Sequence, residues 1–479
     1  MTSGWQAQLE LADIQGNILQ GYTFPFAQYR FFRVDDPAKA RLFIAAVTTR
    51  VTTAELWPNH DKPNSAVNIG FTHRGLTALQ LPSATVDAFS LDFREGMLAR
   101  AGLLADRGES APERWESVWR TGEVHIWISL NATTPEALKA RGDWLDGCVS
   151  EPGGVTQKAL QDAAMRVVNG KPKASEHFGY TDGFGNPPIA GAGPPSTGKT
   201  PGGLGKPLPD GDWAPIAAGE FLLGHVNEQG EVAPTPPPAG LFRNGTFMAY
   251  RKLHQKVATF RRFLQEEGGR YGDPKLLAAK LVGRWPDGTP LALSPQMPYQ
   301  GNAGVTKAYT DFRYSDDPEG LRCPLSAHIR RANPRDAMEF GGGALDPALA
   351  AQLTARRRII RRGRPYGAWT PEGEPGDDQA EHGVIFMALN ASLEHQFEFI
   401  QQRWMNYGSD FRQGNDRDPL AGNQEPEGKF VIPGGVDAPG GHPPHVCFGL
   451  PSFVVTRGGD YFFLPSLSAL RWIAEGGLR

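Results

Sequence analysis

Cysteine is scarce in this sequence. Its 479 residues include three cysteines, Cys148, Cys323 and Cys447, which lie far apart. An odd number of widely spaced cysteines argues against a disulfide framework and suits a reducing compartment. The motifs Cys-x-x-Cys-His and His-Glu-x-x-His are both missing. The sequence therefore predicts no c-type haem attachment and, from its cysteine spacing, no zinc site.

An excess of charge and a long hydrophobic run are also missing. The chain has 49 basic and 52 acidic residues, a formal net charge of −3, so neither nucleic acid nor a membrane is expected as a partner. No run approaches the ~18 consecutive apolar residues of a membrane span. The first ten residues contain no basic segment followed by an apolar one. A secretory signal is thus not expected, and we predict a cytoplasmic protein.

Glycine and proline, in contrast, are abundant, with 58 and 41 residues. They concentrate in loops, and residues 187–215 are so rich in both that no regular element is expected there. Since 40% of the residues are hydrophobic, the chain is long enough for two domains. We predict an N-terminal domain over residues 1–215 and a C-terminal domain over residues 216–479.

Hydrophobic periodicity predicts strands that alternate with helices in both halves. In the first half the expected strands are 27–34, 67–72 and 123–130, and the expected helices are 37–50, one from 75, and 134–148 with Thr133 or Thr134 as N-cap. In the second half the expected strands are 245–251, 383–389 and one from 452 that opens a closing hairpin, and the expected helices are 257–267 and 393–404. This order predicts an α+β fold with helices on one face of a sheet, and it suggests a duplication.

Three segments carry residues suited to one kind of chemistry. Residues 179–183 read Gly-Tyr-Thr-Asp-Gly, residues 323–335 contain His328 before Ile-Arg-Arg-Ala-Asn-Pro-Arg, and residues 361–367 read Arg-Arg-Gly-Arg-Pro-Tyr-Gly. An acid between glycines can move a proton on peroxide, an imidazole can bind iron, and a guanidinium can hold an anionic oxygen. Together they are the groups that a haem peroxidase needs.

These segments resemble the dye-decolorizing peroxidases, whose signature is Gly-x-x-Asp-Gly. The resemblance runs from residues 13–19 to residues 458–465, so it covers nearly the whole chain. It implies two ferredoxin-like domains, each an antiparallel sheet with helices, and one non-covalent haem b per chain, bound mainly in the C-terminal domain. It also implies a peroxidase that uses hydrogen peroxide to oxidise dyes, phenols or other one-electron donors through an oxyferryl intermediate. The length of the chain is similar to that of the family's larger group.

The resemblance gives roles to individual residues. His328 matches the iron ligand, and a proximal histidine needs an acceptor on its other ring nitrogen. Asp418 matches that acceptor best, and Asp416 is the alternative. Asp182 is expected to be the distal acid. His177, five residues before it, is the second candidate for a histidine at the pocket.

On the distal side, Arg361 stands four residues before the proline of Pro-Tyr-Gly, which is the position of the family's catalytic arginine. Arg364 is expected to bind a haem propionate. Phe386 fits the apolar distal wall, and it fits plain core packing equally well. These residues complete the predicted site.

Two other functions can be weighed from the sequence. A protein that binds haem or handles its iron with little turnover would keep His328 but would need neither Asp182 nor Arg361. Residues 193–200 match the phosphate-loop pattern Gly-x-x-x-x-Gly-Lys-Thr, but no hydrophobic strand precedes them and Pro201 follows, so nucleotide binding is rejected. The expected partners are hydrogen peroxide and small reducing substrates. The sequence leaves open whether the protein forms a homo-oligomer.

Overall fold

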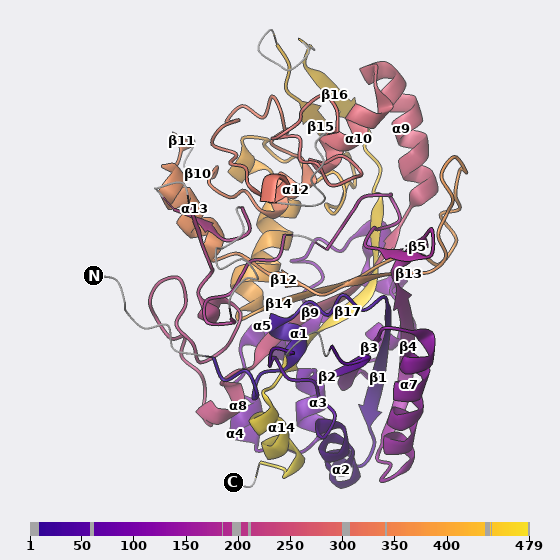
Figure 1. The fold of residues 1–479 in the computed structure, drawn as a ribbon, viewed down its shortest axis with the longest axis vertical. Coiled ribbons are helices and arrows are strands. Elements are labelled where there is room, and N and C mark those ends of the chain that lie inside the picture. The colour runs from indigo at the N-terminus through magenta and orange to yellow at the C-terminus, as the bar shows by residue number, and fades with distance from the viewer. Residues whose placement is uncertain are drawn as a thin grey trace.

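The computed structural model describes residues 9–57, 62–183, 185–193, 203–208, 212–298, 307–340, 343–435, 441 and 443–477. Its centre is a nine-stranded sheet in which every recorded pairing is antiparallel (Figure 1). The strands are β1 (Phe26–Val34), β2 (Ser65–Phe71), β3 (Ile126–Ala132), β4 (Val155–Ala164), β9 (Thr246–Gln255), β12 (Ile360–Arg361), β13 (Arg364–Tyr366), β14 (Gly383–Asn390) and β17 (Val454–Leu464). The predicted α+β class is confirmed.

The longer helices are α2 (Pro37–Thr48), α3 (His73–Ala78), α5 (Leu91–Ala99), α7 (Pro135–Ser150), α9 (Val257–Tyr271), α10 (Pro274–Val282), α12 (His328–Ala332), α13 (Pro347–Ala355) and α14 (Leu467–Ala474). Four-residue helices are α1 (Gly16–Leu19), α4 (Ser83–Val86), α6 (Ser117–Arg120), α8 (Ala239–Phe242) and α11 (Lys307–Thr310). Small two-stranded sheets pair β5 (Arg166–Val168) with β6 (Lys171–Lys173), β7 (Lys206–Pro207) with β8 (Trp213–Ala214), β10 (Glu339–Phe340) with β11 (Gly343–Ala344), and β15 (Lys429–Ile432) with β16 (His445–Phe448). Within the described ranges, no helix is both long and apolar enough to cross a membrane.

The strand order is the same in both halves. In the first half β4, β1, β3 and β2 are neighbours, which places the fourth strand beside the first, then the third, then the second. In the second half β17, β9, β14 and β12 repeat that order. This is the ferredoxin-like arrangement, and its repetition agrees with a duplication. The domain boundary at residue 215 stays a prediction.

One pairing joins the halves: Phe463 of β17 lies opposite Phe71 of β2. The combined sheet curls, because β4 and β13, which lie toward its two ends, contact each other. Rings from the two halves therefore meet inside it. Tyr250 of β9 packs edge-on against Tyr29 and Phe31 of β1, at centroid distances of 6.1 and 5.2 Å. These rings belong to one buried hydrophobic cluster that draws residues from both halves and stabilises the fold.

Several helices begin with the same local signal. In α2, α10 and α13 an aspartate is the N-cap, a proline follows it, and the carboxylate accepts hydrogen bonds from two backbone N–H groups of the first turn. The helix α7 uses Thr134 and Pro135 similarly, except that the Thr134 hydroxyl accepts one hydrogen bond, from the Ala137 N–H. Proline suits this position because the first N–H groups of a helix have no intrahelical partner. The sequence prediction of a cap at Thr133 or Thr134 is therefore confirmed at Thr134.

Two predicted elements differ from the structure. Residues 393–405 form two consecutive π-helical stretches, Leu393–Glu398 and Ile400–Met405, rather than an ordinary α-helix. The wider turns place Phe397, Ile400 and Met405 on the wall of one cavity. The hairpin expected from residue 452 is wrong. β17 is a single strand of 11 residues, in which the bulge beside Gly458 only shifts the register.

Candidate active site

A cavity of about 350 Å³ lies between one face of the sheet and the segments that surround α12. Its floor consists of side chains that share a sheet face, because residues two apart in a strand point the same way. Arg251, Leu253 and Gln255 come from β9, Val384 and Phe386 from β14, and Val454 and Thr456 from β17. Asp182, His328 and Arg361 line the same cavity. The structure thus brings together three residues that lie up to 179 positions apart.

His328 is the first residue of α12, and its ring points one nitrogen away from the cavity. Nδ1 donates to Asp418, with distances of 2.9 Å to Oδ2 and 3.1 Å to Oδ1. Among the described residues no hydrogen bond involves Nε2. The side chain keeps 31% of its surface exposed although the neighbouring Ala327 is buried, because it faces the cavity. Nε2 is therefore the nitrogen available to a metal.

Asp418 is fully buried and holds its orientation through backbone contacts. Its Oδ1 accepts hydrogen bonds from the N–H groups of Leu420 and Ala421, at 2.9 and 2.7 Å. Burial alone would raise the pKa of Asp418, but His328 and the Ala421 N–H group outweigh it and the pKa is lowered. Burial would likewise lower the pKa of His328, and Asp418 raises it. The carboxylate therefore stays ionised and fixes the proton on Nδ1.

The neighbouring Asp416 does not reach His328. Its carboxylate pairs with Lys429 Nζ at 3.1 Å, and its backbone carbonyl accepts a hydrogen bond from Arg331 Nη1 at 3.1 Å. Arg331 is fully buried and also bonds the backbone carbonyls of Trp404 and Tyr407. Because Arg331 lies three residues after His328, it ties α12 to the segment that carries Asp418. Of the two candidate acceptors, the structure brings Asp418 to the histidine.

On the opposite wall, Asp182 faces Arg361. The distance from Arg361 Nη1 to Asp182 Oδ1 is 3.4 Å, and both side chains are about half exposed. Gly179 and Gly183 have φ values of +98° and +91°, which favour glycine and bend the loop around Asp182. The Asp182 N–H donates to the carbonyl of Ala174 at 3.0 Å. The loop is thus fixed by its backbone, and the carboxylate is left for the cavity.

Asn186 connects this loop to the strand that carries Arg361. Its Oδ1 accepts from the Arg361 N–H at 2.9 Å, and its Nδ2 donates to the Arg361 carbonyl at 3.1 Å. One residue earlier, the Gly185 carbonyl accepts from Arg358 Nη2 at 3.1 Å. The acid and the arginine are therefore held at a fixed spacing by three hydrogen bonds between their segments.

Further arginines make the cavity wall strongly positive. Arg335 donates hydrogen bonds to the backbone carbonyls of Thr310 and Phe312. Arg358 donates to the backbone carbonyl of Gly185. The acceptors in these three hydrogen bonds are neutral. Burial, together with Arg335 and Arg361, lowers the pKa of Arg358 to about 9. Burial also lowers the pKa of Arg284 and of Arg335 to about 10. An anionic group in the cavity would stabilise the charged form of these buried guanidinium groups.

A haem fits this set of donors. One imidazole nitrogen is free for iron while the other is held by a carboxylate, which is the usual arrangement of a metal-binding histidine. The cluster of buried arginines matches two propionate groups. Phe386 and Val384 supply an apolar surface on the sheet side. Phe386 also packs on Phe397, with ring centroids 6.3 Å apart.

Two predicted residues are not brought to the cavity. Arg364 is not among its lining residues, and burial lowers the pKa of its guanidinium. His177 is also absent from the lining, and it stacks on Trp369 at a centroid distance of 4.2 Å. Arg284 and Arg335 line the cavity although neither was given a role from the sequence. The position of Arg335 in the His328 segment could have indicated a role at the cavity. No feature of the sequence around Arg284 indicates such a role.

The phosphate-loop match over residues 193–200 lies, apart from Gly193, outside the described residues. Its rejection therefore stays a prediction.

Comparisons with known proteins agree with this geometry. A family model, the DyP dimeric alpha+beta barrel domain, matches residues 13–163. The dye-decolorizing peroxidase msp1 of Mycetinis scorodonius is 31% identical over 493 residues, which cover 98% of this chain and 88% of that protein. An ancestral D-type dye-decolorizing peroxidase gives a TM-score of 0.78 at 28% identity and covers 97% of this chain and 99% of its own. A dye-decolorizing peroxidase in complex with 2,6-dimethoxyphenol gives a TM-score of 0.77 at 26% identity. The match covers 97% of this chain and 100% of that chain.

Proposed function

Because this chain belongs to the dye-decolorizing peroxidase family, it is a haem-dependent peroxidase, and we propose that His328, Asp182 and Arg361 carry its reaction with hydrogen peroxide. Its similarity over nearly full chains to a fungal enzyme and to a D-type enzyme assigns it to the larger group of that family. The full-length relatives are peroxidases, so the comparisons do not favour the haem-handling alternative. The observation that carries the proposal is the convergence of an acid, an arginine and an imidazole on one cavity.

Haem b would be held by His328 through Nε2, with Arg335 and Arg358 facing the propionates. When bound, the haem supplies the iron at which the O–O bond is cleaved and stores the two oxidising equivalents. Asp418 keeps the proton on His328 Nδ1 and makes the imidazole a stronger donor. This side of the site holds the cofactor and sets its electronic state.

Asp182 accepts a proton from hydrogen peroxide and delivers it to the departing oxygen atom, which leaves as water. A carboxylate within reach of both oxygens can do this without a large movement. Arg361 stabilises the negative charge that develops on the departing oxygen, and it stays charged at any working pH. Their 3.4 Å separation lets both groups act on one peroxide molecule.

Stopped-flow absorption of the haem-loaded enzyme mixed with hydrogen peroxide tests these roles. We expect Asp182→Asn to slow the reaction by roughly 10²–10⁴-fold and Arg361→Leu to slow it by roughly 10²–10³-fold. Asp143→Asn and Arg120→Leu, which change exposed residues of α7 and α6, are matched controls that should leave the rate unchanged. Wild-type rates in both active-site variants would refute the assignment.

For the reducing substrates we propose phenols and dyes, as small one-electron donors. The related structure with 2,6-dimethoxyphenol supports this choice. Peroxide-dependent oxidation of 2,6-dimethoxyphenol by the holoenzyme should be measurable, and it should fall in parallel with the stopped-flow rate in Asp182→Asn. Oxidation that does not depend on peroxide would contradict the proposal.

We propose a cytoplasmic location, which the three free thiols support. Fractionation of cells that express the full-length protein tests this. Recovery outside the cytoplasm would refute it.

A further inference from the structure

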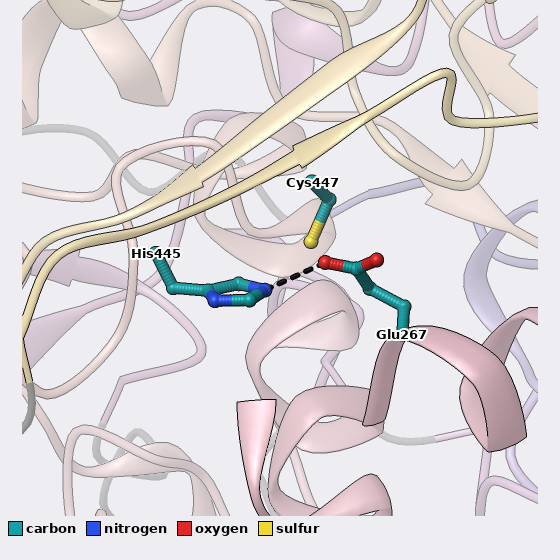
Figure 2. Close-up of side chains that lie close together, drawn as sticks. All are labelled: Glu267, His445 and Cys447. Atoms are coloured by element: carbon teal, nitrogen blue, oxygen red, sulfur yellow. Dashed lines mark hydrogen bonds and ion pairs between the residues drawn. The ribbon is translucent and has the colours of Figure 1, made fainter. Parts of the chain in front are cut away.

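A second group of ligand-type side chains lies outside the haem cavity, between α9 and the β15–β16 hairpin. Glu267, His445 and Cys447 each offer one ligand atom, and these atoms all lie within 4.8 Å of one another. Figure 2 shows Glu267 reaching from its helix toward the two residues of the strand. None of the three lines the cavity.

The strand geometry explains why the two strand residues converge. His445 and Cys447 are two positions apart on β16, so their side chains leave the same face. They lie opposite Ile432 and Phe430 of β15, which are buried, whereas Phe448 on the other face is 71% exposed. The face of His445 and Cys447 is therefore the one that packs against α9, where Glu267 lies near the end of the helix.

The present contacts argue against a nucleophilic site. His445 Nε2 lies 2.7 Å from Glu267 Oε1, so the imidazole pairs with the carboxylate rather than with the thiol. Burial, and then the Glu267 carboxylate, raise the pKa of the Cys447 thiol to about 12. A thiol beside an anion is a poor nucleophile. A carboxylate, an imidazole and a buried thiol instead form a set of metal donors.

We propose that Glu267, His445 and Cys447 bind one zinc ion, with a water molecule in the fourth tetrahedral position. A thiolate and an imidazole favour zinc over the hard cations calcium and magnesium, which prefer oxygen ligands. The thiol proton is released to solvent when the sulfur binds.

Arg270 also pairs with the Glu267 carboxylate. Its Nη1 lies 2.7 Å from Glu267 Oε2, and 63% of its side chain is exposed. Arg270 contacts Oε2 whereas His445 contacts Oε1, and the exposed Arg270 side chain can turn into solvent when the ion binds. Zinc would therefore replace Arg270 at Glu267 without disturbing the packed face of the hairpin.

The ion would connect the hairpin to α9 and stabilise one wall of the haem pocket. Cys447 belongs to a small apolar core that also contains Phe430, Leu420 and Tyr180. Tyr180 and Leu420 line the haem cavity, two residues from Asp182 and Asp418. The expected effect of the ion is on the hairpin and on this wall of the pocket, and it does not depend on the roles proposed for Asp182 and Arg361.

The test uses haem-loaded enzyme that has been treated with a chelator, dialysed and titrated with zinc chloride. Calorimetry should give one site per chain. Absorption at the zinc K-edge should show one sulfur at about 2.3 Å beside nitrogen and oxygen at about 2.0–2.2 Å. Zinc should also raise the melting temperature of the wild type. The zinc edge is separate from that of the haem iron, so the cofactor does not interfere.

Cys447→Ser and Glu267→Gln should each weaken zinc binding by about 100-fold or more. Cys148→Ser, which changes a half-buried cysteine of α7, is the matched control and should bind zinc like the wild type. The wild-type measurements decide the question even if a variant fails to fold. No binding at one equivalent, binding without sulfur scattering, or unchanged affinity in Cys447→Ser would each overturn the proposal.

Discussion

At the scale of single residues, Asp418 is a buried carboxylate that serves two purposes. It accepts two backbone N–H groups and one imidazole N–H. In Asp418→Asn the amide oxygen can still accept the backbone N–H groups, so the fold should survive while the negative charge is lost. Without that charge His328 becomes a weaker donor to iron. We expect the ferric/ferrous reduction potential of the holoenzyme to rise by on the order of 60 mV, which is about 1.4 kcal/mol for one electron.

Spectroelectrochemical titration measures this change, and Asp416→Asn is its matched control. Asp416 lies two residues away and pairs with Lys429 rather than with the histidine. Its substitution should leave the potential within experimental error of the wild type. An equal rise in both variants would show that Asp418 acts through general electrostatics and not through His328.

Asn186 makes the second prediction at this scale. Its side chain holds both the N–H and the carbonyl of Arg361. We expect Asn186→Ala to slow the reaction with peroxide by about tenfold, which corresponds to about 1.4 kcal/mol, with normal haem content. If Asn186 acts by positioning Arg361, the substitution should cause no further loss in an Arg361→Leu background. Additive losses in that double-mutant cycle would rule out positioning.

At the scale of elements, the π-helical segment illustrates what the sequence could and could not predict. The spacing of aromatic residues predicts a helix over 393–404, but not its wider turns. Those depend on distant partners, because Gln396 Nε2 donates to the carbonyls of Glu220 and Arg358. β4 was not predicted, since its burial pattern shows no regular alternation. Local patterns predict an element, and contacts made elsewhere in the chain determine its exact form.

The same distinction holds for the two candidate sites. His328, Asp182 and Arg361 could be named because each stands in a continuous motif. Arg284 has no motif and reaches the cavity only through the fold. The absence of a zinc spacing in the sequence was likewise uninformative about Glu267 and His445, which lie 178 positions apart. Ligands that come together across a fold leave no local pattern.

Glu398 in the π-helical segment gives a prediction about stability. It is 2% exposed and accepts from Arg100 Nε and Nη2 at 2.5 and 2.6 Å and from the Tyr461 hydroxyl at 2.7 Å. Glu398→Ala removes the buried carboxylate that pairs with the largely buried Arg100 and leaves it only the more exposed Glu95, so the free energy of unfolding should fall by about 3 kcal/mol. Urea denaturation measures this. Glu394→Ala, at an exposed position of the same segment, should cost less than about 1 kcal/mol, and an equal loss in both variants would contradict the role of the buried pair.

At the scale of the whole molecule, buried histidines make the folded state sensitive to acid. Burial is the main cause that lowers the pKa of His177, from 6.5 to about 4, and it also lowers the pKa values of His254 and His382. The unfolded chain gains a proton at His177 below about pH 6.5, whereas the folded chain stays neutral there until about pH 4. The stability from this group is present in full above pH 6.5 and is lost, by up to about 3 kcal/mol, as the pH falls toward 4.

Urea midpoints at pH 7.5 and pH 4.5 test this. The wild type should lose more stability between the two values than His177→Gln, whose amide can still donate to the Tyr366 carbonyl as His177 does. The comparison concerns the pH dependence alone, so a uniform loss in the variant does not affect it. Equal pH dependence in the two proteins would show that His177 titrates normally in the folded state.

The position of β17 has a consequence for how the protein is made. Although it is the last strand in sequence order among the described residues, it lies in the middle of the sheet, between β9 and β2. During translation the first half can pair its own strands, but the join at Phe71 and Phe463 must wait for residues 454–464 to leave the ribosome. Val454 and Thr456 on the cavity floor arrive at the same time. The cavity that would hold haem is therefore complete only after residues 454–464 have been made, so haem supply must match this late step rather than the start of synthesis.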